Sequence, residues 1–193
     1  MSRKNSQKKT YLNDFTLGED GKYKYSGAIV EIGTNEKSFK KFARSLWAWG
    51  LICAALQIMC GCIPAAGMSN TIYVILPYAA GLISTGVLLY FIPGLTAKGG
   101  RVREYIYEKN RKIINVCALC DGAFCAVTLI GEIVFIIIYG FSDDAAASVI
   151  FMASHVAAAA FALLARKTLV EIDVKKVCGK LPDDKNGEEN GKK

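Results

Sequence analysis

The stretch IINVCALCDGAFCAVTLIGEIVFIIIY, residues 113–139, decides the fold of this chain because it carries only two charged residues, Asp121 and Glu132. A run of this length exceeds the roughly 20 residues needed to cross a hydrocarbon layer of about 30 Å, so it predicts a transmembrane helix. Three further stretches of similar length carry no Asp, Glu, Lys or Arg: 46–68, 71–92 and 145–165. The sequence therefore predicts an all-α integral membrane protein whose domain 46–165 is a bundle of four transmembrane helices.

The distribution of basic residues predicts the orientation of this bundle. Of the 24 Lys and Arg residues, ten lie in the N-terminal arm 1–45, six in the link 93–112 and eight in the C-terminal tail 166–193. Cytoplasmic loops retain Lys and Arg whereas translocated loops lack them, so both termini are predicted to be cytoplasmic, in the cell membrane. The net charge of +7 suits loops beside an anionic leaflet. We therefore expect the lipid bilayer, and not nucleic acid, as a partner.

Parts of the flanks have the pattern of β-strands. Residues 22–25 and 28–32 flank Ser26 and Gly27, which predicts a short β-hairpin in the N-terminal arm. An isolated hairpin is only marginally stable in water, so we expect it to dock on a third strand. Residues 168–174 fit that strand, and they also fit a continuation of the fourth helix. The sequence leaves both alternatives open.

Capping residues and prolines predict where the helices begin and bend. Thr34 or Asn35 is placed to cap a helix that runs into the first span. Pro64 and Pro77 lie inside predicted spans, where a missing N–H predicts kinks. Residues 101–112 read as a basic helix that lies along the inner membrane surface before the third span begins.

The third stretch places its two acids on one helical face. Asp121 and Glu132 are eleven residues apart, close to three turns, so they lie about 16 Å apart along the helix axis. Cys117, Cys125 and Thr128 fall on the same stripe. A carboxylate that faces lipid is costly, so this stripe is predicted to face the bundle interior or a wet cavity.

Two polar residues of other spans are placed to meet this stripe. His155, the only His of the chain, lies near the middle of the fourth span, between the depths of Thr128 and Glu132. Gln57 of the first span lies within reach of Asp121. The candidate intramembrane polar site therefore consists of five residues: Asp121, Glu132, His155, Gln57 and Thr128.

Three interpretations of these groups remain open. In the first, Asp121, His155 and Glu132 form a ladder of titratable groups that suits proton or cation movement. In the second, each polar group hydrogen-bonds a neighbouring helix and fixes which helices meet. In the third, Glu132 extends toward water at the outer interface. We predict no metal and no cofactor, because the His and the membrane-embedded Cys residues form no recognisable ligand set; Asp121, Glu132 and His155 would hold a cation only if they converge.

The fourth stretch is rich in Ala and Ser. Small side chains let helix backbones approach closely, so this helix is predicted to be the most buried of the four. Gly81 and Thr85 of the second stretch are predicted as the surface that matches it.

The spacing of Cys117 and Cys120 resembles the CxxC pair of four-helix membrane oxidoreductases of the vitamin K epoxide reductase type. That resemblance implies thiol redox chemistry at an extracytoplasmic pair. Here the pair lies near the predicted cytoplasmic end, and the predicted external loops carry no Cys to relay electrons. The sequence also contains no P-loop, GxGxxG, HExxH or GxSxG motif.

These observations predict a small non-enzymatic integral membrane protein that acts through helix–helix or partner contacts. It would work in a homo-oligomer or beside another membrane protein. The first alternative is a proton- or cation-coupled transporter that uses Asp121, Glu132 and His155. The weaker alternative is a membrane thiol oxidoreductase.

Overall fold

Four long helices dominate the computed structural model, which describes residues 15–17, 23–25, 27–140 and 145–177. They are α2 (Glu36–Gly61), α4 (Ile72–Phe91), α6 (Glu104–Tyr139) and α7 (Ala145–Glu171). All four are long and apolar enough to cross a membrane, as expected of a multi-pass membrane protein. The predicted all-α bundle of four apolar helices is thus confirmed, while its insertion and orientation stay predictions.

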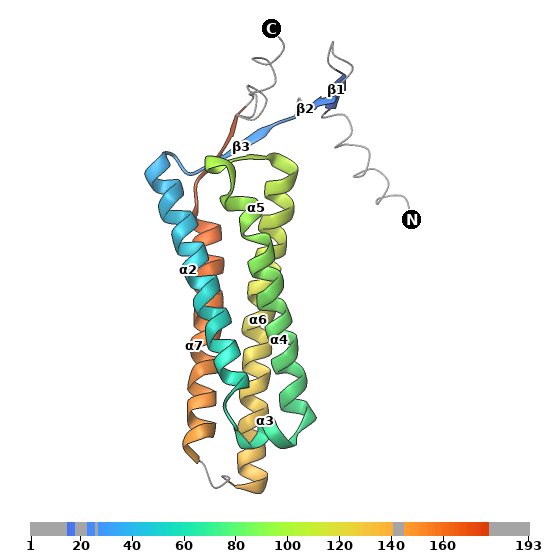
Figure 1. Cartoon of the computed structure of the whole chain (residues 1–193), viewed down its shortest axis with the longest axis vertical. Coiled ribbons are helices and arrows are strands. Elements are labelled where there is room, and N and C mark those ends of the chain that lie inside the picture. Colours follow the sequence, from blue (N-terminus) through green and yellow to red (C-terminus); the bar gives the residue numbers. More distant parts are fainter. Residues whose placement is uncertain (1–14, 18–22, 26, 141–144, 178–193) are drawn as a thin grey trace, which may run out of the picture.

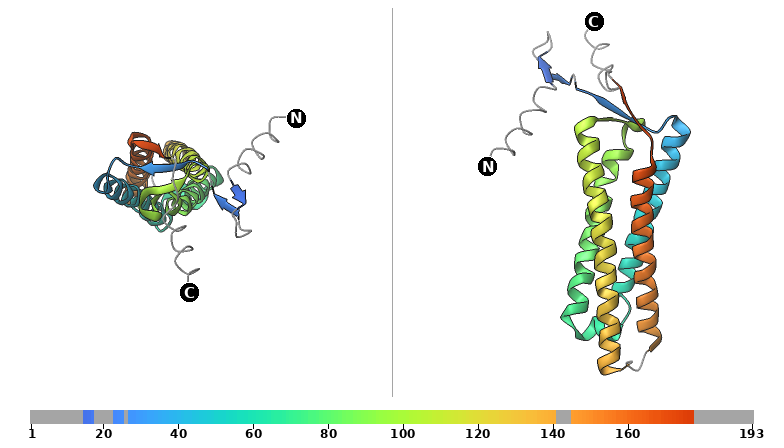
Figure 2. Two further views of the ribbon diagram at one scale, coloured as in Figure 1. Left: turned by 90° about the horizontal axis from the view of Figure 1, so that it is seen from above. Right: turned by 180° about the vertical axis from the view of Figure 1, so that it is seen from behind.

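The helices form a square bundle in which each long helix packs on the next one along the chain, and α7 packs back on α2 (Figure 1). Helix α2 packs on α4 and α7, and α6 packs on the same two helices, so α4 and α7 lie diagonally opposite (Figure 2). The prediction that Gly81 and Thr85 of α4 match the fourth helix is therefore wrong. A Cβ added at Gly81 would instead meet Asp121 and Phe124 of α6.

A three-stranded sheet closes one end of the bundle, called the sheet end below (Figure 1). Its central strand β3 (Ile29–Ile32) pairs antiparallel with β4 (Arg101–Arg103) and with β5 (Val174–Val177). Val30 lies opposite Val102 on one side and Lys176 on the other. The sheet packs on the helices through Val30, Ile32 and Val102, which share a buried core with the sheet-end turns of all four helices.

The predicted hairpin between residues 22–25 and 28–32 is wrong, although both segments contain a strand. Strand β2 (Tyr23–Tyr25) pairs with β1 (Phe15–Leu17), and β3 pairs with the link and the tail. The physical reason is burial: β3 becomes a central strand with partners at both edges and three buried side chains, Ile29, Val30 and Ile32. A two-stranded hairpin would leave one edge of β3 unpaired. The turn residue Ser26 lies outside the described residues.

Both alternatives for residues 168–174 hold in part. Helix α7 continues to Glu171, as the helical alternative predicted. The docking strand is also present, but it begins only at Val174 and runs to Val177. Leu169 is fully buried on the helix instead of on a strand.

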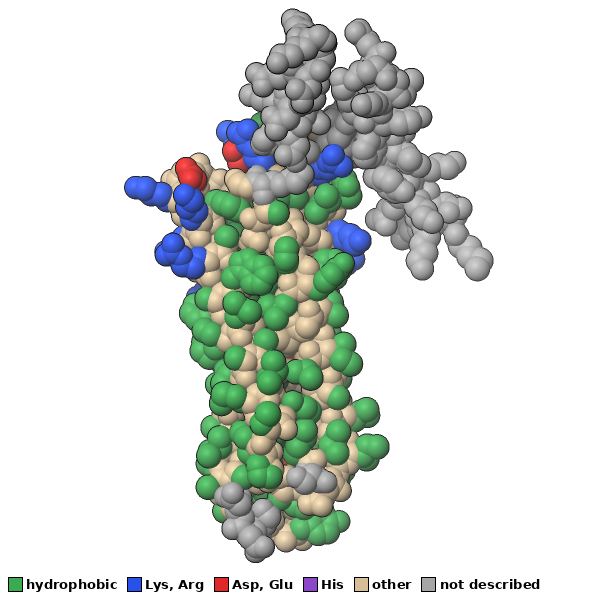
Figure 3. Space-filling view, in the orientation of Figure 1, with side chains coloured by type: hydrophobic (Ala, Val, Ile, Leu, Met, Phe, Trp, Pro, Cys, Tyr) green, Lys and Arg blue, Asp and Glu red, His purple; other side chains and the backbone are tan. Residues whose placement is uncertain are grey.

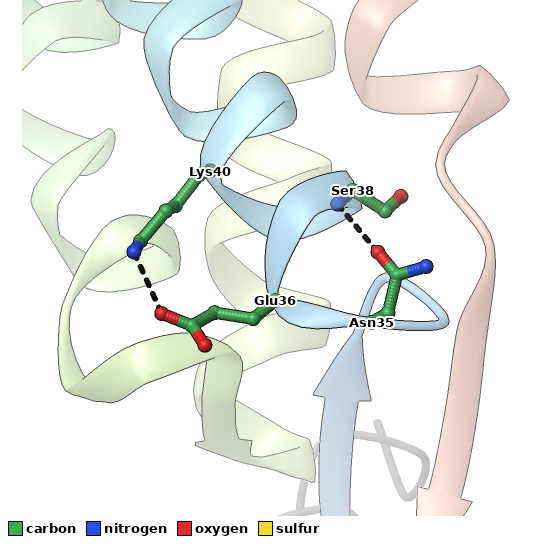
Figure 4. Close-up of polar contacts among 4 residues, drawn as sticks. All are labelled: Asn35, Glu36, Ser38 and Lys40. Carbon is green, nitrogen blue, oxygen red and sulfur yellow. Dashed lines mark hydrogen bonds and ion pairs between the residues drawn. The ribbon is translucent and has the colours of Figure 1, made fainter.

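Helix α2 begins at the predicted cap. The Asn35 side chain accepts a hydrogen bond of 2.8 Å from the Ser38 backbone N–H, and Glu36 pairs with Lys40 one turn later at 2.6 Å (Figure 4). An Asn at this position satisfies one of the otherwise free N–H groups of the first turn. The cap thus sets where the chain leaves the sheet and enters the bundle.

The first span does not run to residue 68. Helix α2 ends at Gly61, and a separate short helix, α3 (Ala66–Asn70), precedes α4. Pro64 explains the interruption, because proline lacks an N–H and disfavours helical geometry at the residue before it. Pro64 therefore ends a helix instead of kinking one, whereas Pro77 does lie inside α4 as expected. The end of the bundle opposite the sheet is called the α3 end below.

Residues 101–112 do not form a separate surface helix. Residues 101–103 are strand β4, and Glu104 begins α6, which continues without a break to Tyr139. At 36 residues α6 is about 54 Å long, so it spans the full length of the bundle. Two glycines with positive φ, Gly99 and Gly100, turn the chain from the short helix α5 (Pro93–Thr96) into β4.

The surface of the bundle divides along its length. In the face shown in Figure 3, the Lys and Arg side chains gather at the sheet end and apolar side chains cover the remainder. In the most apolar part of each helix, 39% of the residues of α7 are buried, compared with 28% of the residues in each of the other three helices. This confirms the prediction that the small-residue helix is the most buried.

Candidate functional site

Asp121 lies at the centre of a polar cluster that joins three helices. Its side chain is fully buried. The carboxylate accepts hydrogen bonds from Cys53 Sγ at 3.1 Å, from Thr85 Oγ1 at 3.0 Å and from Gln57 Nε2. Cys53 and Gln57 belong to α2 and Thr85 to α4, so one acid on α6 binds both neighbours through neutral donors. We call these four residues the Asp121 cluster.

Gln57 crosses the centre of the bundle, because α2 and α6 lie diagonally opposite each other. The predicted approach of Gln57 to Asp121 is confirmed. Its amide nitrogen also lies 3.8 Å from Cys125 Sγ. The amide oxygen, Oε1, is buried and has no hydrogen-bond partner among the described residues. The cluster therefore keeps one unused acceptor.

Glu132 is held at the other end of the bundle by different groups. Its Oε1 accepts from Ser148 Oγ of α7 at 2.9 Å and from the Gly67 backbone N–H of α3 at 3.3 Å. The side chain is fully buried, so the interpretation in which Glu132 extends to water is wrong. The physical reason is that α3 folds under the bundle and covers this position. Its second oxygen, Oε2, is buried without a partner among the described residues.

His155 lies between the two acids but hydrogen-bonds neither of them in the described structure. Its Nδ1 is 3.0 Å from the Phe151 carbonyl oxygen, one turn earlier on α7. A carbonyl only accepts, so Nδ1 carries the proton in this arrangement. The ring packs against Phe151, with centroids 4.3 Å apart, and against Tyr78 of α4 at 6.0 Å. His155 thus joins α7 to α4 by ring contacts.

Thr128 does not join helices. Its Oγ1 donates to the Phe124 carbonyl of its own helix at 2.9 Å. Thr128 lines a narrow crevice together with Gln57 and His155, in which no space remains for a water-sized sphere. The predicted depth of His155 beside Thr128 agrees with this shared lining. The stripe of α6 therefore faces the bundle interior, as predicted, and not a wet cavity at this point.

The three titratable residues do not converge on one point. Among the described residues, no three His, Cys, Asp or Glu side chains are grouped closely enough to hold a metal ion. Asp121 and Glu132 contact separate sets of donors, and His155 is bound to a backbone carbonyl. The arrangement is a row of separate polar contacts along α6 and α7.

The thiols near the sheet end are not joined to each other. Cys117 and Cys120 are both free and half-buried. The Cys117 carbonyl accepts from Ser84 Oγ of α4 at 3.0 Å, which adds a further link between α4 and α6. Cys53 is the thiol that the structure brings to a carboxylate, and the CxxC spacing gave no sign of it.

Sequence reasoning did not assign four of the residues that contact the two acids: Cys53, Thr85, Ser148 and Gly67. A signal for one of them, Cys53, was present. Cys53 and Gln57 are four residues apart on α2, so they share a helical face. Gly67 had no signal, because its role depends on the break in the first span that Pro64 causes.

Comparison of the chain with protein-family models, with curated proteins and with solved structures finds no match.

Proposed function

We propose that this chain is a non-enzymatic integral membrane protein that acts through contacts, in a homo-oligomer or as an accessory subunit of another membrane protein. One observation carries the proposal: Asp121 and Glu132 are fully buried and take their hydrogen bonds from neutral groups of other helices. This is the pattern expected of polar groups that fix which helices meet. Both acids are thereby engaged within the bundle, which leaves the apolar outer faces and the sheet end for partners.

We further propose that the sheet end faces the cytoplasm. The three basic segments of the sequence meet there, since β3, β4 and β5 belong to the arm, the link and the tail. The chain has no Lys or Arg between Arg44 and Lys98 or between Lys112 and Arg166. Retention of Lys and Arg on the cytoplasmic side supports this orientation.

The orientation is tested by labelling from outside. Single Cys residues are placed in a Cys-free background at Ser69 or Ser142, which we expect to be external, and at Ser6 or Asn186, which we expect to be cytoplasmic. In intact cells a membrane-impermeant thiol reagent should label the first pair alone. Labelling of Ser6→Cys or Asn186→Cys in intact cells would reverse the orientation.

A specific observation favours a second candidate, a proton- or cation-coupled transporter. Two buried oxygens, Oε1 of Gln57 and Oε2 of Glu132, have no partner among the described residues. Both oxygens are free to accept a further hydrogen bond from a proton donor that enters the interior. Intramembrane acids and His residues are the usual groups in proton relays.

Reconstitution separates the two candidates. Proteoliposomes with the wild type, Asp121→Asn, Glu132→Gln or His155→Gln are subjected to imposed pH and cation gradients. The contact function predicts no flux above empty liposomes for any of them. Wild-type flux that Asp121→Asn abolishes, with unchanged thermal stability, would establish the transporter instead.

A second measurement tests the contacts directly. Membranes that contain tagged and untagged copies are cross-linked, extracted in mild detergent and analysed for mass and composition. We expect either a second copy of this chain or one partner at fixed stoichiometry. A monomer without any stoichiometric partner after cross-linking would contradict the contact function.

A further inference from the structure

The sheet end contains a cavity that the polar interior does not explain. It lies between the first turns of α6 and the last turns of α7, and residues of β3 and β5 complete its wall. Its volume is about 500 Å³, within the usual range of small-ligand pockets. We call it the sheet-end cavity.

The charges of this cavity are unevenly placed. Four basic and two acidic side chains line it: Arg111, Lys112, Arg166, Lys176, Glu104 and Glu108. Glu104 forms an ion pair with Lys176, and the negative charge of Glu108 also stabilises the charged form of Lys176. Both acids thus compensate the one basic residue contributed by the sheet. On α6 they lie one to two turns farther from the bundle than Arg111 and Lys112.

The half of the cavity nearer the bundle is left with excess positive charge. Arg111 and Lys112 form no ion pair with any residue that the structure describes. Arg166 uses its Nε–H to donate to Asn115 Oδ1 at 2.8 Å, which orients the guanidinium group. A guanidinium has five N–H donors, so four remain. This arrangement favours an anion with several oxygens, and phosphate is the group that Arg recognises best in this way.

Tyr107 supplies a second, independent sign of a ligand. It lines the cavity and is only 4% exposed, yet its hydroxyl has no hydrogen-bond partner among the described residues. A phenol is protonated at neutral pH, so this hydroxyl is a donor there. The Arg111 guanidinium lies 5.9 Å from the centre of the Tyr107 ring. A buried donor without an acceptor is costly, so a ligand oxygen that reaches this hydroxyl would be favoured.

An apolar seam leads from the cavity along the outside of the bundle. Val170 of α7 lines the cavity, and Leu163 and Val156 follow at intervals of seven residues on the same side of the helix. All three are about half exposed, at 52%, 47% and 59%. A Cβ added at Gly122 of α6 would meet Leu163 at 4.0 Å, so the seam runs between α6 and α7. It has the length and chemistry to hold an acyl chain.

We infer that the sheet-end cavity binds the phosphate group of an anionic phospholipid, whose acyl chain lies along the α6–α7 seam. Basic pockets between helix ends on the cytoplasmic side of a membrane suit such headgroups. The inference rests on the proposed membrane orientation, and it is independent of whether the interior relays protons.

The experiment measures lipid binding to the purified full chain in detergent. Native mass spectrometry counts bound phosphatidylglycerol and phosphatidylcholine, and thermal unfolding is followed with each lipid and with inorganic phosphate. The test variant combines Arg111→Gln with Arg166→Gln. The control variant, Lys37→Gln with Lys167→Gln, removes the same charge outside the cavity.

We expect phosphatidylglycerol to bind and to stabilise the wild type more than phosphatidylcholine does. The test variant should bind it at least about tenfold more weakly, as expected for the loss of charge-assisted hydrogen bonds, and the control should stay within about twofold. Equal weakening in both variants, or equal binding of the two lipids, would overturn the inference. Stabilisation by inorganic phosphate alone, lost in the test variant, would overturn the lipid source and retain the phosphate site.

Single changes keep the test informative if the double variant does not fold. Tyr107→Phe removes the unpartnered hydroxyl, so it should leave the lipid-free melting temperature unchanged or raise it, while phosphatidylglycerol binds about fivefold more weakly. Lys112→Gln should weaken binding similarly. Unchanged affinity in both single variants would also overturn the inference. Lipid counting needs neither flux nor oligomerisation, so a failure here is distinct from a failure of the proposed function.

Discussion

The two buried acids of α6 differ in how many of their oxygens accept hydrogen bonds and in which elements supply the donors. Asp121 uses both carboxylate oxygens and receives its hydrogen bonds from side chains of α2 and α4. Glu132 uses one oxygen, which accepts hydrogen bonds from a hydroxyl of α7 and from a backbone N–H of α3. The first acid ties three long helices together, and the second ties α6 to α7 and to the short helix α3. The difference predicts that the same kind of substitution has unequal effects at the two positions.

The largest effect is expected from Asp121→Ala. This change leaves the donors of Cys53, Gln57 and Thr85 without their acceptor and opens a cavity at the meeting point of three helices. An unsatisfied buried donor costs about 1–3 kcal/mol, so we expect a loss of about 3 kcal/mol or more in the free energy of unfolding. Denaturation in detergent followed by circular dichroism measures it. Glu132→Ala should cost about half as much, and equal losses would remove the distinction.

Ala158→Leu tests how tightly the helices close around the Asp121 cluster. Ala158 is fully buried against Cys53 and Cys125, so a larger side chain has no space. Overpacking costs about 1–3 kcal/mol, and we expect about 2 kcal/mol. Val149→Leu and Leu163→Ala, at exposed positions of the same helix, should change stability by less than about 0.5 kcal/mol. Equal tolerance at the three positions would mean that α7 is not closely packed.

Gly67→Ala tests the contact that holds α3. A Cβ at this position would collide with Oε2 of Glu132, so the carboxylate has to move away from the Gly67 N–H. We expect a loss of about 1–2 kcal/mol. Gly86→Ala is the matched control, because nothing lies within 4 Å of its added Cβ. The control should be neutral or slightly stabilising, since Ala is the better helix former.

The smallest effect is expected from the isosteric changes Asp121→Asn and Glu132→Gln. Both keep shape and an acceptor oxygen, and the unused Oε1 of Gln57 is available to accept from a new amide. Stability should change by less than about 1 kcal/mol at either site, as read by the thermal midpoint in detergent. A loss of several kcal/mol at Asp121 alone would show that the ionised carboxylate itself is required.

The four apolar helices and the inward stripe of α6 were predictable from the sequence because each depends on local composition and helical period. Asp121, Thr128 and Glu132 all point inward, since a carboxylate cannot face lipid without cost. The partners of these residues were harder to predict. They depend on which helices are neighbours, and the square arrangement makes Thr85 face α6 and not α7.

Most of the predictions that the structure contradicts concern the two ends of the bundle. The strand segment near residues 29–32 was recognisable from its pattern, but its partners come from segments that lie far away in the sequence. No local signal specifies such a pairing. At the other end, the hydrophobic run continues past Pro64, so the sequence favours a kink there and not a helix end. The chain instead uses the break to place α3 under Glu132.

The pairing of β3 with β5 has a consequence for the order in which the protein is assembled. Val30 meets Lys176 only after the ribosome has produced all four helices, whereas the two strands β3 and β4 are available far earlier. Until then, β3 has an open edge and exposed N–H and C=O groups, which makes it a binding site for any other extended chain. Strand β5 thus completes the sheet and withdraws that edge, so a nascent chain halted before Val174 should be retained by chaperones while a chain that includes β5 is released.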